Sequence, residues 1–339
     1  MKMKLITIIG FLFFAWTIFG QQEAQFTQYY SNPYLFNPAS GGLKKIIDID
    51  LGYRRQWIGL SGAPQSFYAT AHTEISFDKR NTVLNEHNSE DESIYATPTN
   101  SVGKNKHVVG GKVFADQIGP FQKINVMASY AYHLRFTQKT MLSFGVNAGY
   151  SNFGINPNKV ILLDNDDYKY ENFLSRNSNQ SIFDLGAGMT FYGKEFQFGI
   201  SSSQLLNNNL KLGEVETSAH FSSHFFLYGM YNFNLEDTKL SVEPHFMTQF
   251  ASGAPASVNI GARLHYDKRY WVNVSYRLQD AIAFGVGLNF AKNLHLGYSY
   301  DVAIGKVQRP NNYVHEISLG LMFGSKSSKE KDLQDDEMM

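Results

Sequence analysis

The feature that most constrains this chain is an alternation of bulky apolar with small or polar residues, repeated along most of its length. Between positions 282 and 290 the bulky residues are Ile282, Phe284, Val286, Leu288 and Phe290. Between positions 294 and 302 they are Leu294, Leu296, Tyr298, Tyr300 and Val302. Successive side chains of a β-strand point to opposite faces of a sheet, so this period of two predicts strands with one bulky face. The chain is therefore expected to be all-β.

The second face of these segments separates a membrane barrel from a soluble β-sandwich. In a soluble sandwich that face would carry Lys, Glu and Thr, whereas here it is rich in Gly, Ser and Asn with isolated ionisable residues. A lipid-facing apolar band around a polar lumen, with aromatic girdles at both interfaces, fits this pattern, and a soluble all-β fold is the alternative. The residues expected in the girdles are Tyr130, Tyr132, Tyr150, Trp271, Tyr276, Tyr298 and Tyr300.

The number of alternating segments sets the size of the barrel. They lie at residues 46–54, 65–75, 106–116, 121–135, 140–151, 181–192, 195–203, 220–234, 239–250, 256–266, 270–278, 281–290, 293–302 and 314–323. Beyond residue 20 no stretch approaches the roughly 18 apolar residues of a spanning helix, so a mature membrane protein would have to span with strands. We predict a transmembrane antiparallel β-barrel of about fourteen strands, with a short N-terminal periplasmic segment.

The ends of the chain differ from its middle. Lys2 and Lys4 precede an apolar run from Leu5 to Phe19, which predicts a secretory signal peptide over residues 1–20. Ile18 occupies a position where a small residue is preferred before cleavage, and an uncleaved membrane anchor is the alternative. The predicted organisation continues with an N-terminal periplasmic or plug segment at 21–45, the barrel at 46–323 and a disordered polar tail at 324–339.

An even strand number predicts that both termini lie in the periplasm and that short periplasmic turns alternate with longer outer loops. Short turns are expected near residues 136–139, 193–194, 235–238, 267–269 and 291–293. Long loops are expected at 152–180, 204–219 and 303–313. The polar stretch 76–105 breaks the rule, because it falls where a short turn is expected. It is a disordered insertion, a periplasmic contact surface, or a sign that the topology is displaced by one strand.

Charge and cysteine content exclude several classes of function. The 30 basic and 30 acidic residues balance, so no net field favours nucleic acid, and the absence of cysteine removes disulfides and thiolate chemistry. The mixed signs of the lumen-facing residues favour a lumen closed by its own charge network or by an inserted segment over an ion-selective pore. On the predicted register these residues are Asp48, Asp50, Arg54, His72, Glu74, Lys112, Asp184, Glu243, His245, Arg263, Arg277, His295, Asp301 and Glu316.

Catalytic signatures are poor. His315-Glu316 lacks the second His that a zinc-protease helix needs, and it lies in a strand pattern. The paired glycines at 186 and 188, and at 285 and 287, lie in strand patterns with no following helix, so phosphate binding is not expected. We predict a protein that is not an enzyme and that holds no cofactor or metal.

Short motifs spread over nearly the whole mature chain resemble the PorP/SprF family of type IX secretion outer-membrane proteins. They are Gln25-Phe26-Thr27-Gln28-Tyr29-Tyr30-Ser31-Asn32-Pro33-Tyr34-Leu35-Phe36-Asn37-Pro38-Ala39, Gly41-Gly42, Tyr53-Arg54-Arg55-Gln56-Trp57, Gly62-Ala63-Pro64, Asp116-Gln117-Ile118-Gly119-Pro120, Ser129-Tyr130-Ala131-Tyr132, Ser275-Tyr276-Arg277, Tyr298-Ser299-Tyr300-Asp301 and His315-Glu316-Ile317-Ser318-Leu319-Gly320. Each motif is weak alone, and their shared order and spacing carry the resemblance.

The resemblance implies a Bacteroidota outer-membrane barrel that works with the type IX secretion and gliding machinery. It implies a large cell-surface adhesin or similar cargo as partner, bound through the cargo's C-terminal domain, with periplasmic type IX components as further candidates and outer-membrane lipid around the barrel. The 76–105 insertion and the extension after Phe323 depart from the family pattern and put the subfamily in doubt. A channel for solute uptake is the alternative function, because barrel physics alone fits both.

The candidate partner-binding residues come from the N-terminal motif and from lumen-facing positions. Asn-Pro favours turn initiation, so the two Asn-Pro pairs form either a structured lead-in at the periplasmic mouth or a plug or docking element for a periplasmic partner. The predicted set is Asn32, Pro33, Asn37, Pro38, Arg54, Trp57, Arg277, Asp301 and Glu316.

Overall fold

The computed structural model describes most of the barrel and the segment before it. The described residues are 25–43, 47–75, 105–160, 179–212, 215–220, 222–251, 254–290, 293–304 and 313–323. The predicted signal peptide, the polar tail and nearly all of the 76–105 stretch lie outside these ranges.

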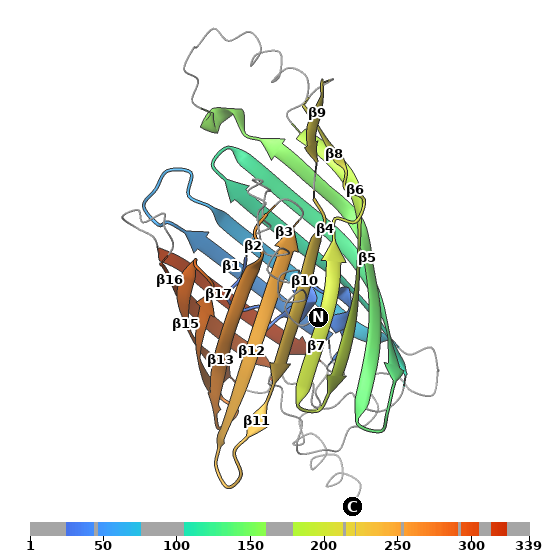
Figure 1. Ribbon diagram of the computed structural model, residues 1–339, viewed down its shortest axis with the longest axis vertical. Helices are drawn as coiled ribbons and strands as arrows, with labels where there is room; N and C mark the ends of the chain where they lie inside the picture. The colour runs from blue at the N-terminus through green and yellow to red at the C-terminus, as the bar shows by residue number, and fades with distance from the viewer. Residues whose placement is uncertain are drawn as a thin grey trace, which may run out of the picture.

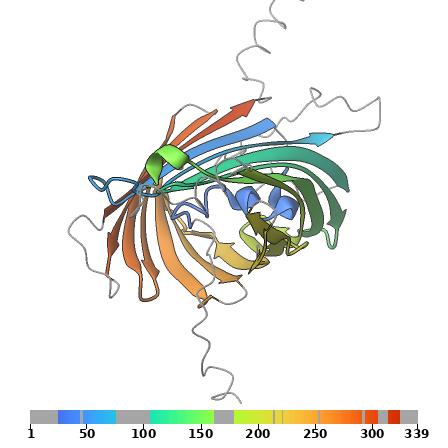
Figure 2. The same ribbon diagram turned by 90° about the horizontal axis from the view of Figure 1, so that it is seen from above.

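Within the described residues, fourteen antiparallel strands close into one barrel (Figures 1 and 2). They are β1 (Ile47–Gln56), β2 (Gln65–Ile75), β3 (Lys106–Ile118), β4 (Phe121–Arg135), β5 (Thr140–Ile155), β6 (Asn179–Gly193), β7 (Phe196–Ser203), β10 (His224–Tyr231), β12 (Leu240–Ala251), β13 (Ser257–Tyr266), β14 (Tyr270–Arg277), β15 (Ala281–Phe290), β16 (Leu294–Ala303) and β17 (Tyr313–Phe323). The pairing of β1 with β17 and of β10 with both β7 and β12 closes the wall.

Three further short strands lie outside this ring. The strands β8 (Asn209–Leu212) and β9 (Val215–His220) form a separate hairpin between β7 and β10. The two-residue strand β11 (Phe233–Asn234) continues the pairing with β12 beyond β10.

The structure confirms the predicted fold class and strand count. The segments predicted at 65–75, 121–135 and 281–290 coincide with β2, β4 and β15. Other limits differ by a few residues, as in β5, which continues to Ile155. The period of two fixes the existence and face of each strand, while its end depends on where pairing with the neighbour stops.

The two ends of the barrel are named here by their place in Figure 1. The upper end carries the β1–β2 connection at 57–64 and the β14–β15 connection at 278–280. The lower end carries the turns at 136–139 and 267–269, and β17 ends there at Phe323. The wall is uneven, because β4, β5 and β6 have 15, 16 and 15 residues while β14 has 8.

The two faces of the wall have the polarity expected of a membrane barrel. On the outer face Val274, Val286 and Ile317 are 54%, 53% and 53% exposed. On the inner face Ser275 and Glu316 are buried. Apolar side chains outside and polar side chains inside reverse the order found in water-soluble proteins, and this arrangement suits lipid around a polar lumen. Among the described residues no helix is long and apolar enough to cross a membrane.

Candidate functional site: the filled lumen

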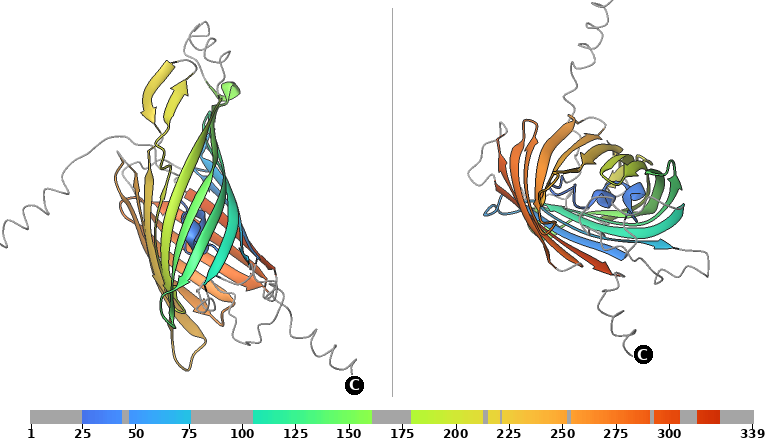
Figure 3. Two further views of the ribbon diagram at one scale, coloured as in Figure 1. Left: turned by 90° about the vertical axis from the view of Figure 1, so that its right-hand side faces the viewer. Right: turned by 90° about the horizontal axis from the view of Figure 1, so that it is seen from below.

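The segment before β1 lies inside the barrel. We call residues 25–43 the lumen segment; it contains two short 3-10 helices, η1 (Pro33–Leu35) and η2 (Pro38–Ser40). Figure 2 and both views of Figure 3 show it within the ring of strands. Its side chains are nearly all buried, and it is surrounded by the inner faces of strands from β1 round to β17.

The inner wall is polar in the register predicted from sequence. Most of the predicted lumen-facing ionisable residues are buried, namely Asp48, Asp50, Arg54, His72, Asp184, Glu243, His245, Arg263, Arg277, Asp301 and Glu316. Glu74, Lys112 and His295 are half-buried. These groups ring the lumen segment, so their fixed positions determine how it can be held.

Four buried charges converge on Thr27 near the upper end. We call Arg54, Arg277, Asp301 and Glu316 the charge cluster. Arg54 donates from Nη2 to Asp301 Oδ2 and from Nη1 to Glu316 Oε2, each at 2.8 Å. Arg277 Nη2 lies 3.5 Å from Asp301 Oδ2. Two cations and two anions balance, which is what burial of charge in a protein interior requires.

Thr27 completes this cluster. Its hydroxyl donates to Asp301 Oδ2 at 2.7 Å and accepts from Arg54 Nη1 at 3.1 Å. Its backbone N–H donates to Glu316 Oε2 at 2.8 Å, and the next N–H, of Gln28, donates to Glu316 Oε1 at 2.9 Å. One carboxylate therefore accepts hydrogen bonds from two successive backbone N–H groups. The charge cluster thus fixes the position of the main chain at Thr27 and Gln28.

The middle of the lumen segment is held by aromatic and polar contacts. Tyr29 Oη lies 2.6 Å from His245 Nδ1. Arg263, paired with Glu243 at 2.6 Å, lies over the ring of Tyr30 at 4.6 Å from its centroid. The Tyr29 hydroxyl is therefore hydrogen-bonded, whereas the Tyr30 hydroxyl is buried without a hydrogen-bond partner.

The lower half is held mainly by neutral hydroxyls and carbonyls. Asn37 caps η2 by accepting from Ala39 N at 2.9 Å, and its Nδ2 donates to Thr190 Oγ1 at 3.0 Å and to Met189 O at 3.1 Å. Ser40 Oγ is hydrogen-bonded to the Tyr228 hydroxyl. These contacts fix the second Asn-Pro turn against β6 and β10.

The segment leaves the lumen at the lower end. Gly42 N donates to His72 Nδ1 at 3.1 Å, and Lys106 Nζ donates to Gly42 O. Leu43 packs in an apolar cluster with Met141 and Tyr192. These wall residues lie at or near the lower ends of β2, β3, β5 and β6.

Two wall glycines let the lumen segment come close, Gly145 to its main chain and Gly188 to the side chain of Asn37. A Cβ at Gly145 would lie 2.3 Å from the backbone N of Ala39, and one at Gly188 would lie 2.0 Å from Asn37 Oδ1. Real Cβ contacts do not occur at these distances, so both positions are reserved for glycine by the segment. The space that these small residues leave on the inner face of the wall is thus filled by the lumen segment.

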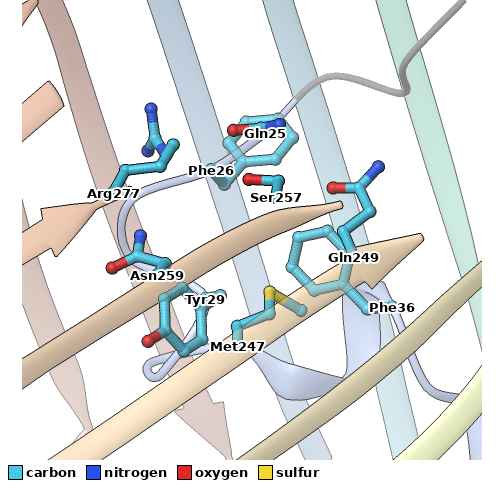
Figure 4. Close-up of a pocket in the computed structure, with 9 residues that line it drawn as sticks. All are labelled: Gln25, Phe26, Tyr29, Phe36, Met247, Gln249, Ser257, Asn259 and Arg277. Atoms are coloured by element: carbon cyan, nitrogen blue, oxygen red, sulfur yellow. The ribbon is translucent and has the colours of Figure 1, made fainter. Parts of the chain in front are cut away.

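A recess lies between the lumen segment and strands β12 to β14 (Figure 4). It is lined by Gln25, Phe26, Tyr29, Phe36, Met247, Gln249, Ser257, Asn259 and Arg277. Gln249 Nε2 and Asn259 Oδ1 are buried there without a hydrogen-bond partner. Because the lumen segment supplies four of the nine lining residues, the recess is part of the same site.

The structure brings most predicted site residues together. The two Asn-Pro pairs begin η1 and η2, and Asn32 Nδ2 donates to Thr70 Oγ1 at 2.9 Å. Arg54, Arg277, Asp301 and Glu316 form the charge cluster described above. Trp57 stands apart, 38% exposed in the β1–β2 connection. The contacts observed are to the chain's own segment, so binding of a partner protein by these residues stays a prediction.

Two aspects of the site differ from the sequence analysis. Trp271 was expected in an interface girdle but is 5% exposed and packs against Tyr30 in the lumen. It shares its face with Asn273 and Ser275, which strand periodicity places inside. The role of Thr27 was also missed. Its presence in the N-terminal motif was the available signal, but the motif does not say what the hydroxyl meets.

A catalytic or metal-binding arrangement is not apparent in the described part of the chain. No group of three or more His, Asp and Glu side chains there could hold a metal ion. The buried ionisable groups are instead engaged with each other and with the lumen segment. The arrangement therefore suits holding a polypeptide in place.

Comparison with known proteins identifies the family. The family model described as "Type IX secretion system membrane protein PorP/SprF" matches residues 18–321. A search of curated proteins finds no match.

Several solved structures are similar in fold at low identity. The toluene transporter TodX of Pseudomonas putida is 10% identical, with 91% of this chain and 98% of that chain covered and a TM-score of 0.49. The toluene transporter TbuX of Ralstonia pickettii is 13% identical, with 91% and 97% covered and a TM-score of 0.47. A FadL homologue of Pseudomonas aeruginosa is 10% identical, with 91% and 95% covered and a TM-score of 0.46. The family match covers nearly the whole chain, which therefore belongs to the PorP/SprF family of type IX secretion system membrane proteins of the outer membrane.

Proposed function

We propose that this barrel binds a large cell-surface adhesin or similar cargo of type IX secretion through the cargo's C-terminal domain, and helps to secrete or anchor it as part of the gliding machinery. The observation that carries the proposal is the family match over residues 18–321, which makes the chain a secretion-system barrel. Family membership also points to a non-enzymatic membrane protein.

The filled lumen supports protein handling over solute uptake. The lumen segment is hydrogen-bonded to opposite sides of the wall, to Glu316 of β17 and to Thr190 of β6. A solute would have to displace these contacts, and displacement would remove the Thr27 and Gln28 donors from the buried carboxylates of Glu316 and Asp301. The partner domain would therefore bind outside the lumen.

We place the partner-binding surface at the upper mouth. The β8–β9 hairpin lies in the β7–β10 connection at this end, and connections on a rigid barrel are where binding residues concentrate. With the lower end, where β17 ends, in the periplasm, the upper mouth faces the cell exterior. A secreted domain would meet it there.

Co-purification tests this proposal. Tagged barrel from cells is expected to bring down a secreted protein in stoichiometric amount, and a fusion carrying only that protein's C-terminal domain should be retained equally well. Replacing residues 209–220 by a Gly-Ser linker should abolish retention, whereas replacing the lower turn 136–139 by another four-residue turn should not. Retention that survives loss of the hairpin would remove the hairpin from the binding surface.

A separate measurement addresses the uptake alternative. Purified barrel in planar bilayers is expected to show no large steady conductance, because the lumen segment fills the barrel. A steady conductance together with absence of any protein partner would overturn the proposal in favour of a channel.

A further inference from the structure

The lumen segment runs through the barrel in one direction, from the upper end to the lower end. Thr27 meets Glu316 and Arg54, which lie within three residues of the upper ends of β17 and β1. Leu43 packs on Met141 and Tyr192, each one residue from the lower end of its strand. The next described residue, Ile47, begins β1 at the lower end.

The first described residue lies at the upper mouth. Gln25 lines the recess together with Ser257, the first residue of β13, and Arg277, the last residue of β14. Both of these strand ends are at the upper end, and Figure 4 shows the three side chains around one recess. The chain thus enters the described structure on the side opposite Phe323, where β17 ends.

This pass through the lumen changes the topology that strand counting predicts. An even number of strands leaves the start of β1 and the end of β17 at the same end of a barrel. Here both lie at the lower end. The lumen segment crosses the barrel once more before β1. Its amino-terminal residue, Gln25, therefore lies at the upper end, opposite the start of β1.

We infer that the amino end of the processed chain is displayed at the upper mouth, on the opposite side of the outer membrane from the carboxyl end of β17. If the signal peptide ends at Gly20, four residues precede Gln25, and they reach at most about 14 Å. Even β14, with 8 residues, runs about 27 Å along its length. Four residues cannot return to the lower end, so this placement replaces the expectation of two periplasmic termini.

On this placement Gln25, the first residue of the N-terminal motif, lies at the surface that an exported protein would meet. The placement rests on the orientation assigned under the proposed function, with the lower end in the periplasm. A periplasmic component could reach the lower end of the segment near Gly42, whereas Gln25 would be presented to the exterior beside the unpartnered Nε2 of Gln249 and Oδ1 of Asn259. The amino end then belongs to the outer surface of the barrel.

Cysteine labelling in intact cells tests the placement, because the chain contains no cysteine of its own. Gln25→Cys is compared with Ser61→Cys in the exposed upper connection and Gln138→Cys in the exposed lower turn. A membrane-impermeant maleimide is expected to label Gln25→Cys and Ser61→Cys in intact cells, and Gln138→Cys only after the outer membrane is opened. Glu23→Cys provides a second variant, because Gln25 is only partly exposed.

The outcomes separate this inference from the proposed function. If Gln25→Cys and Glu23→Cys are labelled only under the conditions that label Gln138→Cys, the amino end lies at the lower end and the inference is wrong. If Ser61→Cys is protected and Gln138→Cys is labelled in intact cells, the orientation is inverted and the amino end is not on the cell surface. Neither result depends on whether a cargo co-purifies.

Discussion

The upper and lower halves of the lumen segment are held by different chemistry. At the upper end Thr27 and Gln28 bind Glu316, and Thr27 also binds Asp301 and the arginines paired with them. At the lower end Asn37 binds Thr190 and a backbone carbonyl, and Ser40 binds Tyr228. The upper half is therefore held by a cluster of paired charges, and the rest of the segment by neutral groups together with Lys112 and Lys106, which donate to the backbone carbonyls of Leu35 and Gly42.

This difference in chemistry determines which half is sensitive to single changes. Removing one member of a buried charge set leaves its partners uncompensated, at a cost of about 3–5 kcal/mol, whereas a neutral hydrogen bond contributes about 1 kcal/mol. The charge cluster fixes the position of the segment but need not add net stability. Replacing the whole set of buried charges by neutral residues of similar shape can give a protein that is equally stable.

Removal of the Arg54 guanidinium is expected to have the largest effect. Arg54→Met keeps much of the side-chain volume but leaves Glu316 and Thr27 without this donor, and only Arg277 remains beside Asp301. We expect a loss of about 3–5 kcal/mol in the free energy of unfolding. Urea unfolding in detergent micelles, followed by the gel mobility of the folded barrel, measures it.

The neighbouring arginine provides the matched control. Arg55 is exposed on the outer face of β1, so Arg55→Met should change stability little. Adding Glu316→Gln to Arg54→Met removes one anion with the cation and should recover part of the loss. Equal effects of the Arg54 and Arg55 variants would show that the cluster does not hold the segment.

The sequence allowed the wall to be predicted better than the contents of the lumen. The period of two gave fourteen strands and placed Arg54, Asp301 and Glu316 on the inner face, because strand geometry alone decides the face. That these side chains converge on Thr27 depends on closure of β1 against β17 and on the register Arg54↔Glu316. Registry between the first and last strands is not encoded in either strand alone.

The path of the lumen segment was also beyond the sequence pattern. The Asn-Pro pairs predicted turns, and η1 and η2 begin there, but turn chemistry does not give the direction in which a segment crosses a barrel. The clue available was the inner face of β5 and β6, where Gly145 and Gly188 leave space. If the glycines only border an open lumen, they say nothing about its contents. If they mark a place where another part of the chain approaches closely, they predict an inserted segment.

Filling one of these glycine positions tests the lower half. In Gly145→Val the added Cβ would lie 2.3 Å from the backbone N of Ala39, and a backbone atom cannot turn aside as a side chain can. We expect the lower half of the segment to shift, at a cost of about 1–3 kcal/mol, with increased conductance in planar bilayers.

A substitution on the other face of the same strand is its control. Ala148 is three residues away on β5 with the opposite side-chain direction, so Ala148→Val adds volume toward lipid. It should leave conductance unchanged. If both variants conduct alike, the effect comes from the strand and not from the lumen segment.

Loss of the Asn37 amide is expected to have a smaller effect. Asn37→Ala removes the donor to Thr190 Oγ1 and Met189 O and the cap of η2, but it leaves no buried charge. We expect a loss of about 1–2 kcal/mol in the same unfolding measurement. Asn152→Ala, which removes an exposed bond to Ser181, is the control and should have little effect. A loss as large as that of Arg54→Met would mean that charge does not distinguish the halves.

Two serine substitutions, which have the smallest expected effects, test whether the upper half is sensitive because of its charges or because of its position in the barrel. Ser318 donates to Gln28 Oε1 at 2.7 Å in the upper half, and Ser201 donates to Phe36 O at 3.0 Å farther along the segment. Both are buried neutral hydroxyls, so Ser318→Ala and Ser201→Ala should each cost about 1 kcal/mol. If charge makes the upper half sensitive, the two losses will be equal within error. If Ser318→Ala lowers the free energy of unfolding several times more than Ser201→Ala, the position of the upper half in the barrel also makes it sensitive. The charge cluster then accounts for only part of its stability.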